Sequence, residues 1–297
     1  MTGNQRGIVA IVGCMTAYTG NDVLVKQILL QHYPVGETIF LRGMISALLI
    51  GGFVVALGHA PHMRAAMSRL LAARSVCDGL STACFIAALA QMPLANIAAV
   101  LQIGPLLITV LSVLFFREVV GWRRWTAIAV GFFGALLVIK PLPSTFDIWA
   151  VIGAGSALFA ALREMQNRSI DRAVPTLVIA FWGAVAITAF GTLFAFSEDW
   201  RLFELSDLIR LFVASMFVGI AIYLMALAFR DVDLSVVAPF RYSYLITSAI
   251  AGLLVFGEWP DGWTVAGAAL IVASGIYLLH REALRRRQLT AKITPAL

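Results

Sequence analysis

Charged side chains are scarce in this sequence, and their scarcity limits the class of protein. Asp, Glu, Lys and Arg together make up 13% of the 297 residues, whereas 61% of the residues are hydrophobic. A soluble domain is about half apolar and about a quarter charged. The composition therefore excludes an ordinary soluble protein and predicts an integral membrane protein.

Cysteine and histidine are also rare, and neither forms a reactive pattern. Cys14, Cys77 and Cys84 lie inside apolar runs without CxxC spacing, which is typical of small core residues and not of disulfides or metal ligands. The four histidines lie in loops or near the ends of apolar runs, and neither HExxH nor GxSxG occurs. We therefore expect no enzyme, no metal and no cofactor. The sequence also lacks the repeated pore charges that are typical of a channel.

What the sequence does contain is ten apolar runs, each long enough for a bilayer core, which needs about 20 residues per helix. They cover residues 7–31, 35–57, 72–91, 94–116, 122–140, 147–169, 174–196, 207–229, 234–256 and 263–280. The first run resembles a signal peptide, but it lacks an A-x-A cleavage site and many further runs follow. We interpret it as an uncleaved first span. Nothing is left over that would form a soluble domain.

Lys and Arg residues are distributed unequally between alternate loops. The set of loops that includes both chain ends carries fifteen of them, whereas the opposite set carries only Lys26, Lys140, Arg201 and Arg210. The positive-inside rule therefore places both termini in the cytoplasm. The positive charge of the chain is a topology signal, and we expect no nucleic-acid partner. The basic tail, residues 282–297, orients the last span or contacts anionic lipid head groups.

The two halves of the chain, residues 1–142 and 143–281, resemble one another. The matching features are Ala-Leu-Ala at 88–90 and 226–228, Glu118 and Glu258, Trp125-Thr126 and Trp263-Thr264, Pro34 and Pro175, and Phe40 and Phe181. Each half holds five spans, and because five is odd, the second half enters the membrane from the opposite side. Such an inverted-topology repeat is typical of carriers whose substrate site lies near the midplane, between two halves that rock.

Each half has a fourth span with a small polar residue and a glutamate, and a fifth span with two glycines. The residues are Asn96, Pro105, Glu118, Gly131 and Gly134 in the first half, and Ser235, Tyr244 (in place of the proline), Glu258, Gly267 and Gly275 in the second. In these features the whole chain resembles the EamA-type repeat of the drug/metabolite transporter superfamily. The resemblance implies an all-α protein of ten transmembrane helices in the inner membrane of a bacterium. It also implies alternating access and export of small metabolites, often amino acids, as in the YddG-like aromatic amino acid exporters.

Charged residues inside the spans form two layers. Charges within the hydrocarbon are costly and face a bundle interior or a cavity. An inner layer is expected from Arg74, Asp78, Arg163, Glu164 and Arg241, and an outer layer from Asp22, Lys26, Glu37 and Arg42. We predict that Asp22, Arg42, Asp78, Arg163 and Glu164 help to form two gates that are closed in turn by ion pairs. Alternatively, Arg74 and Asp78 neutralise one another on one helix face, and Lys26 and Glu37 snorkel to the interface. Glu118 and Glu258, at span ends, are interpreted as caps or loop anchors and not as proton carriers.

Polar and aromatic residues between the layers are the candidates for substrate contact. They are Tyr18, Asn21, Ser81, Gln102, Trp182, Arg241, Tyr242 and Tyr244. Pro105 and Pro239 are expected to disturb their helices and to free backbone carbonyls. Any one Ser, Thr or Asn here is also compatible with a simple contact between helices.

Arg241, within the segment VVAPFRYSYLIT, carries the most specific hypothesis. A guanidinium in an apolar bundle offers a planar fork that fits a carboxylate. We expect Arg241 to bind the carboxylate of an amino-acid-like substrate, with Tyr242, Tyr244 and Trp182 covering its apolar part. The alternative is an internal ion pair of Arg241 with Asp78 or Glu164.

The pattern leaves other properties open. A multidrug exporter of lipophilic cations is the alternative function, although every buried acid has a basic neighbour in the sequence pattern. Proton antiport, exchange and facilitated diffusion all remain possible, and so does import. Because ten helices with internal pseudosymmetry enclose a complete pathway, a monomer suffices.

Overall fold

The computed structural model describes residues 3–65, 68–116, 121–140, 147–167, 169–171, 173–228 and 237–293. Within these residues all regular structure is helical. The helices are α1 (Gly3–Leu30), α2 (Val35–Ala56), α3 (Ala60–Ala65), α4 (Arg69–Leu89), α5 (Leu94–Leu101), α6 (Gly104–Phe116), α7 (Trp122–Ile139), α8 (Ile148–Asn167), α9 (Thr176–Ala195), α10 (Leu205–Ala228), the 3₁₀ helix η1 (Ala238–Tyr242), α12 (Ser243–Phe256) and α13 (Gly262–Ile293).

In the described part of the chain, ten helical stretches are long and apolar enough to cross a bilayer, and they agree with the ten predicted spans to within a few residues. Two of the ten are not regular α-helix throughout their described length, and we call them the discontinuous spans. The fourth span consists of α5 and α6, which meet at Gln102 and Ile103, directly before Gly104-Pro105. The ninth consists of η1, which contains Pro239, followed by α12. Both interruptions occur beside the prolines from which they are predicted, because proline removes a helix hydrogen bond.

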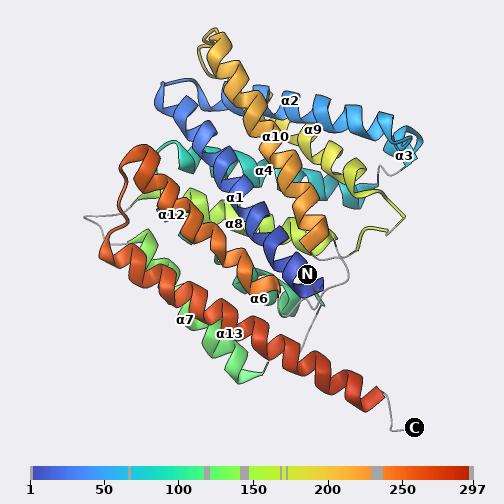
Figure 1. Ribbon diagram of the computed structural model, residues 1–297, viewed down its shortest axis with the longest axis vertical. Helices are drawn as coiled ribbons and strands as arrows, with labels where there is room; N and C mark the ends of the chain where they lie inside the picture. Colours follow the sequence, from blue (N-terminus) through green and yellow to red (C-terminus); the bar gives the residue numbers. More distant parts are fainter. Residues whose placement is uncertain are drawn as a thin grey trace.

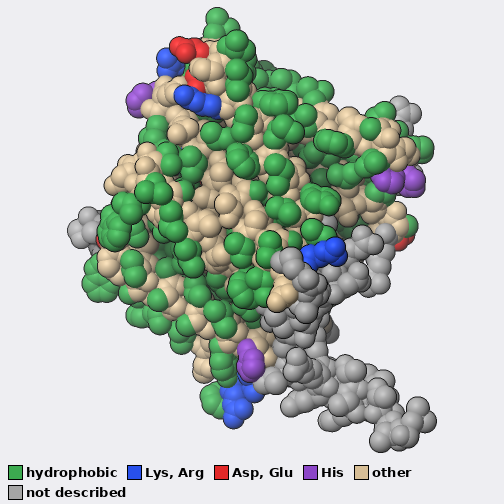
Figure 2. Space-filling view, viewed as in Figure 1, with side chains coloured by type: hydrophobic (Ala, Val, Ile, Leu, Met, Phe, Trp, Pro, Cys, Tyr) green, Lys and Arg blue, Asp and Glu red, His purple; other side chains and the backbone are tan. Residues whose placement is uncertain are grey.

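The outer surface of the helix bundle is apolar. Large hydrophobic side chains such as Leu48, Phe53, Leu114 and Leu254 are exposed. Figure 2 shows hydrophobic side chains and backbone across the broad middle of one face, with Lys, Arg, Asp and Glu at its margins. Such a surface suits lipid and not water. The protein is therefore a multi-pass membrane protein.

The two chain ends lie on the same side of the bundle. In Figure 1, α1 begins and α13 ends at the right-hand ends of their helices, as an even number of crossings requires. The distribution of Lys and Arg assigns this side to the cytoplasm, and we call it the inner side. Helix α13 continues to Ile293, beyond the end of its membrane-crossing part at Arg281.

The packing of the helices follows an approximate two-fold relation. The most extensive contacts are those of α2 with α9, α1 with α10, α7 with α13 and α4 with α8. Helices α2 and α9 are the second spans of the two halves, and α7 and α13 are the fifth, so each packs on its own counterpart. Helices α1 and α8 are the first spans of the two halves, and α4 and α10 are the third. The pair α1–α10 in one half-to-half contact therefore corresponds to the pair α8–α4 in the other. The contacts are therefore those of two interlocked inverted repeats.

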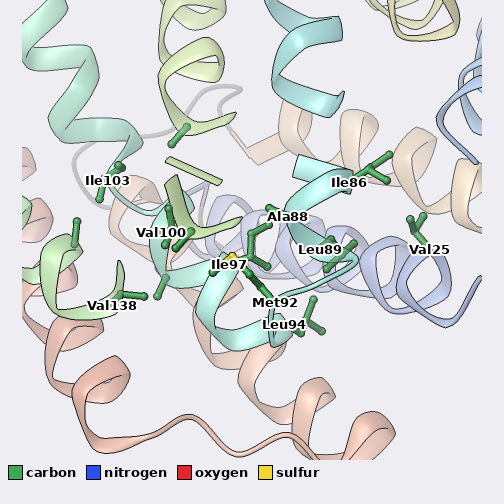
Figure 3. Packing of buried hydrophobic residues seen from close by; sticks show 14 of the residues in the cluster. Val25, Ile86, Ala88, Leu89, Met92, Leu94, Ile97, Val100, Ile103 and Val138 are labelled. Atoms are coloured by element: carbon green, nitrogen blue, oxygen red, sulfur yellow. The ribbon is translucent and has the colours of Figure 1, made fainter. Parts of the chain in front are cut away.

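The largest hydrophobic core surrounds the discontinuous fourth span. Ile97 and Val100 of α5 are fully buried, as are Leu89 at the end of α4 and Leu94 at the start of α5. Figure 3 shows these side chains converging with Val138 of α7. This packing fixes α5 in place, although the span is interrupted after Leu101.

The fifth spans of the two halves approach closely at a pair of glycines. A Cβ atom at Gly134 of α7 would lie 2.7 Å from the carbonyl oxygen of Gly267, and one at Gly267 of α13 would lie 2.5 Å from the carbonyl oxygen of Gly134. Small residues thus allow two transmembrane helices to touch through their backbones.

At the outer ends of α7 and α13, Lys140 and Asp261 form an ion pair. The hydrogen bond from Lys140 lowers the pKa of the Asp261 carboxyl to about 2.

Replacing Gly134 by valine is expected to push α7 and α13 apart. Overpacking of this kind costs about 1–3 kcal/mol, so the unfolding temperature of the detergent-solubilised protein should fall. Gly219→Val in α10 is the matched control, because a Cβ atom at Gly219 meets open space. Equal unfolding temperatures for the two variants would contradict the close contact.

Candidate functional site

A three-membered ion-pair cluster lies toward the inner side of the bundle. Asp78 of α4 accepts hydrogen bonds from Arg74 Nη1 at 2.8 Å and from Arg163 Nη1 of α8 at 2.6 Å. Arg74 also donates through Nε to Asn167 at 3.1 Å and through Nη1 to the Ile179 carbonyl of α9 at 3.4 Å. The Asp78 carboxylate thus joins both halves of the chain, since α4 belongs to the first and α8 and α9 to the second.

A glycine of α9 makes room for this cluster. A Cβ atom at Gly183 would lie 2.4 Å from Asp78 Oδ2 and 2.8 Å from Arg74 Nη1. The backbone of α9 therefore packs directly against the ion pair, and a side chain at this position would displace it. Glu164 is half-buried on α8 and acts on Arg163 and Arg74 electrostatically, but it forms no ion pair with any described residue.

Within the outer charge layer, Asp22 and Arg42 form no direct ion pair with a described residue and are joined through a chain of hydrogen bonds. Asp22 of α1 accepts hydrogen bonds from Tyr244 Oη of α12 at 2.6 Å and from Asn21 Nδ2 at 2.8 Å. Arg42 of α2 donates through Nε and Nη2 to Asn21 Oδ1, at 3.3 and 3.2 Å. Asn21 thus stands between Arg42 and Asp22, because its amide can accept from one and donate to the other.

Lys26 does not snorkel to the interface. Its side chain is only 3% exposed; it forms an ion pair with Glu258, and its Nζ donates to the Met92 carbonyl at 2.9 Å. The other oxygen of Glu258 accepts from the backbone N–H of Leu94 at 2.8 Å, so Glu258 caps the start of α5, as predicted. These contacts join α1, α5 and the end of α12 at the outer side. Glu118, the counterpart of Glu258, lies outside the described residues.

Glu37 is likewise buried and does not reach the interface. Its carboxylate accepts from the backbone N–H of Arg201 at 3.0 Å. Glu198 in turn accepts from the N–H of Gly36 at 2.8 Å, at the start of α2. A carboxylate is favourable at a helix N-terminus. The loop after α9 is therefore fastened over the outer end of α2.

Between the two layers, Tyr18 lies on α1, the helix that packs against η1, which carries Arg241. Within the described part of the chain, the Tyr18 hydroxyl has no hydrogen-bond partner.

Arg241 forms no ion pair with any described residue. The alternative pairing with Asp78 or Glu164 is not found, because Asp78 already binds Arg74 and Arg163. The side chain of Arg241 is exposed, and its helix η1 packs against α1.

Two residues expected at the substrate point elsewhere. The indole N–H of Trp182 donates to the Met63 carbonyl of α3 at 3.0 Å, so this ring is held at the short helix between α2 and α4. Tyr242 is buried against α13, where a Cβ atom at Gly275 would overlap its hydroxyl oxygen. The expectation that these rings surround Arg241 together with Tyr244 is therefore wrong.

Ser81 is a contact between helices. Its hydroxyl donates to the Ser156 carbonyl at 3.0 Å, and the hydroxyl of Ser156 donates back to the Ser81 carbonyl at 2.8 Å. Both residues are buried where α4 packs on α8. Reciprocal bonds of this kind are a common means of joining transmembrane helices, and they leave Ser81 no role in the candidate site.

The two discontinuous spans carry buried polar atoms without hydrogen-bond partners. In the described residues these include Asn96 Oδ1 and Gln102 Nε2 of the fourth span, and Tyr242 Oη and Ser243 Oγ of the ninth. Buried polar atoms are normally hydrogen-bonded, and exceptions are informative. Gln102, at the break itself, offers an unused donor.

No group of three or more His, Cys, Asp or Glu residues suited to a metal occurs in the described ranges.

Comparisons with known proteins agree with this architecture. A family model described as the EamA-like transporter family matches residues 5–140 and again 147–280. A crystal structure described only as that of a protein covers 95% of this chain and 99% of its own, with a TM-score of 0.64 and 18% identity. That likeness shows the fold alone.

Curated relatives are transporters of different small molecules. The pseudopaline exporter CntI of Pseudomonas aeruginosa is 28% identical over 283 residues, which cover 92% of this chain and 96% of the exporter. The S-adenosylmethionine uptake transporter of Rickettsia bellii is 29% identical, but the match spans about three fifths of each protein, 60% of this chain and 61% of the relative. The riboflavin transporter of Vibrio cholerae is 30% identical, over 64% of each. Family and relatives are transporters and not enzymes.

Replacing Gly183 by alanine is expected to disrupt the Arg74–Asp78–Arg163 cluster, because the added methyl group occupies the position of the ion pair. If the cluster acts as a unit, Asp78→Asn and Gly183→Ala should each slow transport, and the double variant should be no slower than the worse single one. Transport rates in proteoliposomes measure this. Gly155→Ala, where a Cβ atom meets open space on α8, is the control. Additive effects would contradict a shared cluster.

Replacing Tyr244 by phenylalanine is expected to destabilise the protein. The change keeps the ring but removes the donor to buried Asp22, and a buried acceptor that loses a partner costs about 1–3 kcal/mol. Thermal unfolding in detergent measures the loss. Tyr223→Phe is the control, because Tyr223 of α10 is exposed and has no hydrogen bond among the described residues. An unchanged unfolding temperature for Tyr244→Phe would show that Asp22 does not need this bond.

Proposed function

This chain belongs to the EamA-like transporter family, and on that premise we propose that it exports amino-acid-like metabolites that bear a carboxylate across the inner membrane of a bacterium. The transport is by alternating access, with no enzymatic step. The two five-span halves, residues 1–142 and 143–281, are the units that move, and a single chain encloses the pathway.

The observation that carries the proposal is the unpaired guanidinium of Arg241. It lies in η1, which packs against α1, and no described acid forms an ion pair with it. An arginine at this depth is costly unless an anion joins it. A carboxylate fits its planar fork with two parallel hydrogen bonds. The substrate therefore supplies the partner that the protein does not.

Two further polar groups with unused hydrogen-bonding capacity support the proposal. The Tyr18 hydroxyl and the Gln102 amide both lack partners among the described residues, and each is a donor. Tyr18 also supplies an aromatic face for the apolar part of a substrate. Trp182, Tyr242 and Ser81 are no longer included, because their contacts hold them elsewhere.

The two charge layers support alternation between an outer and an inner gate. The outer side is fastened by the ion pair of Lys26 and Glu258, and the inner side by Asp78 with Arg74 and Arg163. Because the gates use different residues, each opens without the other.

The direction of transport is proposed from the relatives. Of those described above, the exporter CntI matches over nearly its whole length, whereas the uptake transporter matches over about three fifths.

Export of lipophilic cations is the second candidate. One observation favours it: Asp22 is a buried carboxylate whose direct partners, Tyr244 and Asn21, are uncharged.

The test is counterflow in proteoliposomes that are preloaded with unlabelled amino acids and then exposed to labelled ones. Exchange needs no ion gradient, so its outcome does not depend on the coupling mechanism. Arg241→Ala is expected to raise the half-saturating concentration about tenfold or more, since a hydrogen bond to a charged group contributes about 1.5–3 kcal/mol. The control is Arg210→Ala, which removes an arginine that pairs with Asp207 near the outer end of α10.

Unchanged exchange in Arg241→Ala would overturn the role of Arg241. Absence of any amino-acid exchange, with efflux of a lipophilic cation that depends on Asp22, would establish the second candidate instead.

A further inference from the structure

Asp22 is a buried carboxylate that the proposed binding of substrate at Arg241 does not use. Only 4% of the residue is exposed. Its two oxygens accept from uncharged donors, Oδ1 from Asn21 Nδ2 at 2.8 Å and Oδ2 from Tyr244 Oη of α12 at 2.6 Å. Arg42 of α2 donates to Asn21 and not to the carboxylate. Acidic side chains at such places within a membrane protein mark pathways of ions or protons.

The other ionisable groups on the helices around Asp22 are known. Helix α1 packs on α2, α10, η1 and α12. One turn outward on α1, Lys26 pairs with Glu258, and at the outer end of α10, Arg210 pairs with Asp207. The remaining ionisable groups that the structure describes on these five elements are Arg6, Cys14 and Tyr18 of α1, Glu37 and Arg42 of α2, Tyr223 of α10, Arg241 and Tyr242 of η1, and Tyr244 of α12. Among all of these, only the Tyr244 hydroxyl bonds to the carboxylate of Asp22.

The immediate surroundings of Asp22 suit a proton better than a metal ion. Each carboxylate oxygen already faces an N–H or O–H donor, whereas a hard cation is bound by several acceptor oxygens. A proton needs only one oxygen. The Tyr244 hydroxyl both donates and accepts, so it turns from donor to acceptor when the carboxylate is protonated. The hydrogen bond then loses its charge, and neutral hydrogen bonds are about half as strong as charged ones.

Tyr244 connects Asp22 to the arginine of the proposed substrate site. Arg241 and Tyr244 are three residues apart, across the junction between η1 and α12. The tyrosine is buried in a hydrophobic cluster with Met15 and Ala17 of α1. A change in the bond between Tyr244 and Asp22 therefore acts on the same short segment that carries Arg241.

We propose that Asp22 is the site of a coupling proton, which is exchanged for the substrate. At the outer side, after the pair of Lys26 and Glu258 has opened, a proton from water binds one oxygen of Asp22. At the inner side the carboxylate returns the proton to water, and the substrate then binds Arg241. Each cycle moves one proton inward and one substrate molecule outward. The inference rests on the proposed function and adds its energy source.

The experiment compares two assays of the same proteoliposomes. Counterflow of an amino acid at equal pH on both sides needs no net proton movement, whereas accumulation does. The interior is made one pH unit more acidic than the outside, without sodium and with the membrane potential clamped. The wild type should then concentrate the labelled amino acid up to about tenfold, the ratio that one proton per substrate supports.

Asp22→Asn is expected to keep counterflow but to lose this accumulation, because asparagine keeps an acceptor for Tyr244 but binds no proton. Asp207→Asn is the matched control. Asp207 is also buried and also accepts from a tyrosine, Tyr33 Oη at 3.0 Å, but it pairs with Arg210. The control should accumulate substrate as the wild type does.

Tyr244→Phe supplies a second reading that does not depend on Asp22→Asn being folded. Because protons and substrate exclude one another, wild-type counterflow should decline at low pH. The phenol stabilises the ionised carboxylate, so its removal should move the midpoint of this decline to higher pH, by about one unit or more.

Counterflow without proton-driven accumulation in the wild type would overturn this inference and leave the proposed function standing. So would accumulation that follows a sodium gradient and not a pH gradient. Accumulation that persists in Asp22→Asn would exclude Asp22 as the proton site, and so would an unchanged midpoint in Tyr244→Phe if Asp22→Asn does not exchange. If the wild type exchanges no amino acid at all, the proposed function itself fails.

Discussion

Within a bilayer, a charged side chain has to find its partner inside the protein, because the surrounding hydrocarbon supplies neither water nor counter-ions. This constraint explains where the charges of the structure lie. Asp78 gathers two arginines from different helices, Lys26 reaches Glu258 at the far end of the chain, and Arg42 and Asp22 share the amide of Asn21. Each of these three groups includes a contact between two spans, so the bundle is held together by the groups that would otherwise be most costly to bury. Among the described residues Arg241 forms no such pair, and the proposed site is built on it.

The inverted repeat gives the two sides of the membrane similar frameworks but different contacts. Pairs of equivalent helices pack on one another, and the pairs α1–α10 and α4–α8 exchange places when the halves are exchanged. The residues at corresponding positions nevertheless differ: the outer side uses a hydrogen-bond chain and a buried lysine, whereas the inner side uses a three-membered ion pair that Gly183 accommodates. A carrier needs this combination, because similar frameworks allow two related states and different contacts allow each state to be stabilised separately.

The interruptions in the fourth and ninth spans place backbone ends and unpaired side-chain atoms inside the bundle. Such breaks are tolerated at membrane depth only where other protein groups or a cavity satisfy the freed polar atoms. Here the unused atoms of Gln102 and Ser243 lie at the breaks themselves. The hydrophobic core around Ile97 and Val100 compensates by holding the interrupted fourth span in position.

The sequence by itself determined the ten spans, the inverted repeat, the family and the two interruptions. Those features depend on run length, on an odd number of spans per half and on proline, and each is a property of consecutive residues. It also indicated that Asp78, Arg163 and Arg241 lie at one depth.

Only the tertiary structure decided which way side chains at that depth point. Trp182 and Tyr242 turn to α3 and α13, Ser81 bonds to α8, and Lys26 pairs with a glutamate 232 positions away. Depth follows from position along a span, whereas direction depends on how each helix is rotated against its neighbours, and packing between distant segments sets that rotation.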